Sequence, residues 1–123
     1  MGLANGAFAT REHNNPFSLL TQGSLRMFEN QELMEAMYRA GFNQVFFGLE
    51  SPAAESLKAM GAQKNLQATN ERGKKSMLEK VRAIQKDYFR AQAGFIIGYD
   101  ADPPNIAKLM TNFIDESRIS VAM

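Results

Sequence analysis

Residues 43–52, NQVFFGLESP, limit the possible folds of this chain more than any other segment. The segment is apolar on both sides of a strand pleat, as expected of a strand that is covered on both faces. Its apolar residues are Val45, Phe46, Phe47 and Leu49. Strands of this kind belong to parallel α/β sheets, in which ligands collect at the carboxyl ends of the strands. Glu50 stands at that end, so it is the first candidate functional residue.

Hydrophobic periodicity divides the rest of the chain into alternating strands and helices. Runs of β-forming residues predict strands near residues 17–25, 43–50, 89–98 and 119–123. Apolar residues at helical spacing predict helices near residues 31–40, 52–60, 71–88 and 103–117. Strands that are separated by helices pair in parallel through right-handed crossovers. The predicted fold class is therefore α/β, with four parallel strands.

Start and stop residues support three of the predicted helices. Asn30 offers an N-cap to the first helix, and Gly41 suits the left-handed position after its end. Ser51 and Pro52 predict a hydroxyl cap followed by a proline at the first helical position. Asp102, which two prolines follow, is expected to cap the last helix in the same way.

Charge and cysteine content exclude several classes of function. Fourteen basic and 13 acidic side chains leave a formal charge of +1, so no field recruits nucleic acid or an anionic membrane. The absence of cysteine excludes disulfides, zinc–thiolate sites and an iron–sulfur cluster held by this chain alone. No apolar run approaches the roughly 20 residues of a membrane span, and no signal-peptide pattern is present. These features predict a cytoplasmic protein.

Polar residues and glycines gather where the predicted strands end. Gln22 and Ser24 share one face of the first strand, although they fit a role in satisfying loop backbone groups equally well. The second and third strands end alike, in FFGLE and IIGYD, and a glycine there lets a backbone or a flat ligand come close. Alternation places two sets of residues each on one strand face: Phe46, Gly48 and Glu50; and Gln92, Gly94, Ile96, Gly98 and Asp100.

Two further features have an ordinary structural interpretation that we favour over a functional one. Residues 1–16 show neither the strand period of two nor the helical period of 3.6 residues, and they are expected to form a loose arm or added tail. Within them, His13 is expected to be a solvated loop histidine, because a metal site or proton relay needs several converging groups. The basic cluster Arg72, Lys74 and Lys75 fits a solvated helix face better than a phosphate site.

Three segments of the sequence form a specific combination: AGFNQVFFGLESPAAESLK at residues 40–58, QKN at residues 63–65 and AGFIIGYDADPP at residues 93–104. Together they resemble the second half of the barrel in cobalamin-binding radical S-adenosylmethionine (SAM) proteins. Family members typically show a GIETP-like strand end, a Lys/Gln/Asn segment and a GGFIVGFDSD-like strand in this order. The similarity covers residues 17–123, and it implies half of a TIM-type barrel built from the later strands.

The resemblance also implies a set of cofactor-binding residues. Glu50, with Ser51 beside it, matches the strand end at which family members hydrogen-bond the ribose of the cofactor. Gln22 and Ser24 match a strand that lines the same cavity. The residues that match the strand flanking the adenine are Gly94, Ile96, Gly98 and Asp100.

The sequence departs from this family in the part that carries the chemistry. Radical SAM enzymes hold a [4Fe–4S] cluster on three closely spaced cysteines, and this chain has none. We therefore expect a catalytically silent piece of a larger enzyme that cleaves S-adenosylmethionine, with or without cobalamin, to modify a small organic or lipid-like substrate. This chain alone is expected to bind no metal and no cofactor tightly; any residual affinity for a nucleoside would be weak and would depend on Glu50 and residues 94–98. The alternatives are a stand-alone nucleotide-binding or oligomerisation module, although no GxGxxG or GxxxxGK[ST] phosphate loop is present.

Half a barrel leaves two sheet edges and an apolar inner face without partners. Residues 17–25 and 119–123 are the predicted edge strands. We expect these edges to be covered in a homodimer of half-barrels or by docking to the missing half.

Overall fold

The computed structural model describes residues 17–61 and 73–123. The predictions for residues 1–16, for His13, for residues 63–65 and for the side chains of the basic cluster fall outside the described part. The strands are β1 (Leu19–Gly23), β2 (Phe42–Glu50), β3 (Arg90–Phe95) and β4 (Val121–Ala122). The helices are the 3₁₀ helix η1 (Leu25–Glu29), α1 (Gln31–Ala40), α2 (Ala54–Ala59), α4 (Gly73–Asp87) and α5 (Ile106–Ser117).

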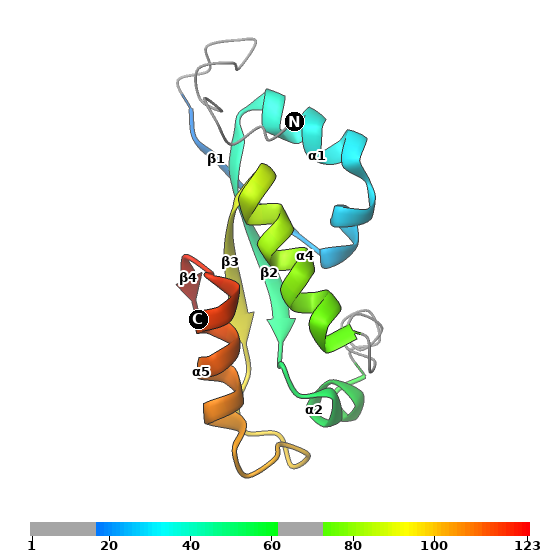
Figure 1. Cartoon of the computed structure of the whole chain (residues 1–123), viewed down its shortest axis with the longest axis vertical. Coiled ribbons are helices and arrows are strands. Elements are labelled where there is room, and N and C mark those ends of the chain that lie inside the picture. The colour runs from blue at the N-terminus through cyan, green and yellow to red at the C-terminus, as the bar shows by residue number, and fades with distance from the viewer. Residues whose placement is uncertain (1–16, 62–72) are drawn as a thin grey trace.

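The four strands form one parallel sheet in the order β1-β2-β3-β4 (Figure 1). Each strand pairs with the next strand in the sequence, and helices lie between them, as in part of a TIM-type barrel. The predicted fold class is thus confirmed. The short β4 is held by backbone bonds from Met123 N to Ala93 O at 2.9 Å and from Phe95 N to Met123 O at 2.7 Å.

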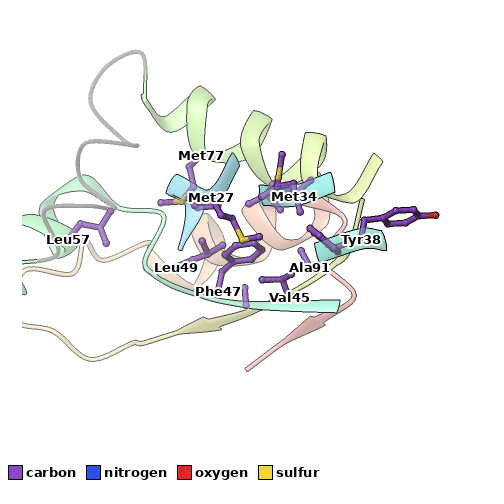
Figure 2. Close-up of a cluster of buried hydrophobic side chains, with 14 residues drawn as sticks. Met27, Met34, Tyr38, Val45, Phe47, Leu49, Leu57, Met77 and Ala91 are labelled. Atoms are coloured by element: carbon purple, nitrogen blue, oxygen red, sulfur yellow. The ribbon is translucent and has the colours of Figure 1, made fainter. Parts of the chain in front are cut away.

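The hydrophobic core lies on one face of the sheet, between β2 and β3 and the helices α1 and α4. Figure 2 shows the side chains of Val45, Phe47 and Leu49 pointing from β2 toward the helices, and all three are at most 1% exposed. The core residues contributed by the helices include Met34 and Tyr38 of α1 and Met77, Val81 and Ile84 of α4. Helices α1, α4 and α5 lie on the same side of the sheet in Figure 1.

The expectation that the second strand is covered on both faces is wrong for the described residues. Gly48 is exposed and Phe46 is only half-buried, although their neighbours in β2 are buried. Right-handed crossovers between strands in sequential order place every crossover helix on the same face. Within residues 17–61 and 73–123, the other face of the sheet therefore has no helical layer.

The first helix begins and ends where its cap residues predict. The side chain of Asn30 accepts a hydrogen bond from Leu33 N at 3.0 Å, which satisfies one of the free amides in the first turn. Gly41 ends the helix with φ at 104°, a conformation that costs a glycine little.

The predicted caps of the two later helices are wrong. α2 begins at Ala54, and the hydroxyl of Ser51 accepts from Ala53 N at 3.1 Å, before the helix starts. α5 begins at Ile106, and Asp102 accepts backbone amides that precede it in the chain. Short polar side chains bond nearby loop amides as readily as helix ends, so the residue type alone does not fix which role is taken.

Three predicted strands are shorter in the structure, among them the fourth, which is reduced to Val121–Ala122. The first ends at Gly23, and residues 25–29 form the 3₁₀ helix η1, which was not expected from the sequence. The third ends at Phe95, so Gly98 and Asp100 follow the strand and do not continue its alternation. Gly98 has φ at 111°, which is incompatible with an extended strand. No helix in the described part of the chain is long and apolar enough to cross a membrane.

Phe47 provides a test of the one-sided core. Phe47→Ala should lower the free energy of unfolding by about 3–5 kcal/mol, because it removes a ring that is 1% exposed and leaves a cavity under α4. Ile97→Ala is the control, since Ile97 is 59% exposed, and its change should stay within about 0.5 kcal/mol. Urea unfolding gives the free energy of unfolding of both variants. Equal losses of stability in Phe47→Ala and Ile97→Ala would contradict the assignment of the buried face.

Candidate functional site

The sheet face opposite the helices, here called the open face, carries part of the predicted site, including Gln22, Glu50 and Gly94. Side chains alternate along each strand, so the residues between the buried ones face this side. Gln22, Phe46 and Gln92 lie in one row across three strands, because Gln22 pairs with Phe46 and Phe46 with Gln92. The open face also includes Leu20 of β1, Gln44 and Gly48 of β2, and Gly94 of β3.

Amide side chains orient one another across the open face. Gln92 Nε2 donates a hydrogen bond to Gln44 Oε1 at 2.7 Å, joining β3 to β2. Gln22 is exposed on β1, one strand away. Such a surface presents hydrogen-bond donors and acceptors together. Phe46 adds an aromatic ring between Gln22 and Gln92, its partners in the neighbouring strands.

Two glycines on the open face make room for side chains of β2. A Cβ atom built on Gly94 would lie 2.9 Å from Cζ of Phe46, so only glycine accommodates the ring where it lies. A Cβ atom on Gly48 would lie 2.8 Å from Oε1 of Glu50, which places the carboxylate on the open face. In this structure the space beside each glycine is therefore filled from β2, by the Phe46 ring and the Glu50 carboxylate.

Glu50 is held in an uncommon backbone conformation at the carboxyl end of β2. Its φ is 67°, and Ser51 N donates to Leu49 O at 2.8 Å across it, as in a γ-turn of the rarer, positive-φ form. The Glu50 carbonyl accepts from Ile96 N at 2.8 Å, which ties this turn to the end of β3. Such conformations cost about 1–3 kcal/mol and persist where the surrounding structure fixes them, often at functional sites.

The carboxylate of Glu50 has no hydrogen bond or ion pair to any other residue in 17–61 and 73–123 for which side chains are described. It is half-buried and points to the open face beside Gly48. An ionised carboxylate only accepts hydrogen bonds, and it accepts them readily from hydroxyl groups. The geometry therefore suits recognition of a ligand hydroxyl at the strand end.

A second polar cluster lies beside the site, in the segment that follows β3. Oδ2 of Asp102 accepts from Gly98 N at 2.9 Å and from Tyr99 N at 3.1 Å, and its Oδ1 accepts from the hydroxyl of Ser56. The Ser56 hydroxyl, followed by the two backbone donors, holds the pKa of Asp102 below its usual value. Ser56 is fully buried in α2, so the cluster joins two segments that are 46 residues apart.

The structure brings some of the predicted site residues together and separates others. Glu50, Gly94 and Ile96 meet where β2 and β3 end, through the Glu50–Ile96 backbone bond. Gln22 lies on the open face of β1. The other predicted residues lie off this face or beyond the strands: Ser51 is buried against the start of α2, Ser24 precedes η1, and Gly98 and Asp100 belong to the loop after β3. Their binding roles stay predictions.

Two features were not predicted from the sequence. They are Gln44, which accepts the hydrogen bond from Gln92, and the bonds of Asp102 to the loop after β3. Gln44 shares the alternation of Phe46 and Gly48, so its face was predictable, but its partner depends on the strand register. In the described part of the chain, no three His, Cys, Asp or Glu side chains lie close enough together to hold a metal ion.

Comparison with known proteins connects the chain to methyltransferases. It is 34% identical over 108 residues to an uncharacterized methyltransferase of Synechocystis sp., an alignment that covers 88% of this chain and 19% of the relative. It is 31% identical over 101 residues to the hopanoid C-2 methylase of Rhodopseudomonas palustris, covering 82% of this chain and 18% of that enzyme. The chain thus spans less than a fifth of the length of these relatives. No family model and no solved structure matches it.

The contact between Gly94 and Phe46 can be tested by a double-mutant cycle. Gly94→Ala should destabilise the protein by about 1 kcal/mol, because the new methyl group displaces the Phe46 ring. In a Phe46→Ala background the same change should be neutral or stabilising by up to about 1 kcal/mol, since alanine suits a strand better than glycine. Urea unfolding of the four proteins gives the coupling energy. A coupling near zero would show that the ring does not lie beside Gly94.

Proposed function

We propose that this chain forms the second half of the barrel of a radical SAM methyltransferase, with the open face as part of the inner wall. The observation that carries the proposal is the parallel sheet whose described helices α1, α4 and α5 lie on one face, while its other face presents Glu50 at the strand ends. The similarity to a methyltransferase and to a hopanoid methylase supports methylation as the reaction class. A small organic or lipid-like substrate is the corresponding proposal for the whole protein.

The residues of the open face fit the nucleoside part of S-adenosylmethionine. Glu50 would accept hydrogen bonds from the ribose hydroxyls, because its carboxylate lies beside Gly48 without a described side-chain partner. The strand end from Gly94 to Ile96 would flank the adenine, with the half-buried ring of Phe46 as a stacking surface. When bound, S-adenosylmethionine supplies the methyl group or the adenosyl radical; the residues of this chain bind and orient it.

The iron–sulfur cluster of radical SAM chemistry does not fit this chain. Iron in such clusters is held by thiolates, and the sequence contains no cysteine. We therefore assign no catalytic step to these residues and propose that the cluster ligands belong to another part of the enzyme. Cobalamin remains a further proposed cofactor of the whole protein.

The proposed barrel also needs strands to close it. β1 and β4 are the edges of the sheet, and Leu20 and Val121 on them are 55% and 42% exposed. Pairing of these edges with the other half of a barrel would bury both the backbone groups and the apolar side chains. A second copy of the chain is the alternative partner, since a two-fold axis along the barrel could pair β1 of each copy with β4 of the other.

Binding of S-adenosylmethionine to the purified chain tests the proposal. Glu50→Ala should weaken binding by about tenfold or more, as expected for the loss of a hydrogen bond to a charged group. The affinity of Glu50→Gln should lie between those of the wild-type protein and Glu50→Ala, because glutamine keeps an acceptor oxygen. Glu55→Ala is the matched control, since Glu55 is an exposed carboxylate on α2. Isothermal titration calorimetry measures all four proteins.

Two outcomes would count against the proposal. Unchanged affinity in Glu50→Ala would remove Glu50 from the site. Equal affinity for ATP and S-adenosylmethionine would favour a general nucleotide-binding module instead.

A further inference from the structure

Asp102 closes a ring of contacts that starts and ends at Glu50. From Glu50 the chain runs through the start of α2 to Ser56, whose hydroxyl bonds Asp102. Asp102 in turn binds the backbone amides of Gly98 and Tyr99. Two residues before Gly98, Ile96 N returns to the Glu50 carbonyl at 2.8 Å. The ring thus links the ends of β2 and β3 by side-chain contacts as well as by the sheet.

One apolar contact supports this ring. Ala53, just before α2, is fully buried against Ile106 and Met110 of α5, and Phe95 packs against the same cluster. These contacts hold the start of α2 against α5. They do not reach residues 97–101, most of which are exposed. The backbone amides of Gly98 and Tyr99 both donate to the side chain of Asp102.

The backbone at Glu50 needs such support. Its φ of 67° is a conformation that a non-glycine residue holds only when its surroundings impose it. The bond from Ile96 N to the Glu50 carbonyl joins this residue to the neighbouring strand, and Ile96 lies one residue beyond the end of β3 at Phe95. A loosened segment after β3 would therefore weaken that bond first.

We infer that Asp102 is a positioning residue that clamps the segment after β3 onto α2, and thereby preserves the Ile96–Glu50 bond and the direction of the Glu50 carboxylate. The clamp can be tested without a ligand. Its consequence for binding rests on the proposed function, because Glu50 contacts no ligand unless the open face is a nucleoside site. A purely local role of Asp102 would order Gly98 and Tyr99 and leave Ile96 unaffected.

Amide hydrogen exchange separates the two roles. In Asp102→Ala, the amides of Gly98, Tyr99 and Ile96 should all exchange at least about tenfold faster, while Val81 in α4 keeps its wild-type rate. Asp102→Asn, which retains an acceptor oxygen, should restore part of the protection. Asp115→Asn is the control, because Asp115 is an exposed carboxylate on α5 with no hydrogen bond to another described side chain.

Two exchange results would overturn the inference. Faster exchange at Gly98 and Tyr99 with an unchanged Ile96 amide would reduce Asp102 to a local loop contact. A uniform acceleration that includes Val81 would show a general loss of stability instead of a positioning role.

Calorimetry with S-adenosylmethionine tests the consequence for binding. Asp102→Ala should weaken binding several-fold, less than Glu50→Ala, and Asp102→Asn should recover part of the loss. If wild-type protein binds and Asp102→Ala binds equally well despite faster Ile96 exchange, the clamp does not act through Glu50. If wild-type protein does not bind, the proposed function fails, and hydrogen exchange alone decides the role of Asp102.

Discussion

The handedness of the crossovers is the constraint on which the rest of the structure depends. Each strand pairs with the next in sequence, so each right-handed connection places its helix on the same side of the sheet. The large apolar residues of β2 on that side, such as Phe47 and Leu49, are buried. The opposite side carries the half-buried Phe46 together with glutamines, glycines and the Glu50 carboxylate. A sheet with this division is suited to form a wall with its helices outside and a binding surface inside.

The sequence predicts the elements well because their signals are local. Apolar runs indicate the strands. Asn30 and Gly41 indicate the ends of the first helix, because few residue types can accept a first-turn amide or adopt a left-handed backbone. Alternation correctly placed Phe46, Gly48 and Glu50 on one face. What failed depends on tertiary context: Ser51 and Asp102 bond loop amides instead of capping helices, and an apolar strand does not reveal whether a helix or another strand will cover each face.

The candidate site combines a fixed backbone with an accessible side chain. The turn at Glu50 is secured by the bond from Ile96 and, through the adjoining segments, by the Asp102 clamp. The carboxylate itself contacts no described side-chain partner and lies beside Gly48. A binding residue benefits from this arrangement, because its backbone position is set before the ligand arrives and only the side chain remains to be ordered. Sequence alone could point to Glu50 but not to Gln44 or Asp102, whose roles depend on residues 46–48 positions away in the chain.

Chemical-shift mapping by NMR tests most directly whether the open face is the inner wall of a cofactor-binding barrel. ¹⁵N-labelled protein would be titrated with S-adenosylhomocysteine, which carries the same nucleoside and is chemically stable. The account predicts that the largest shifts fall on the backbone amides of Gly48, Glu50, Gly94 and Ile96 and on the side-chain amides of Gln22 and Gln92. Shifts centred on α1 and α4, or saturating binding that leaves the open-face amides unchanged, would contradict it.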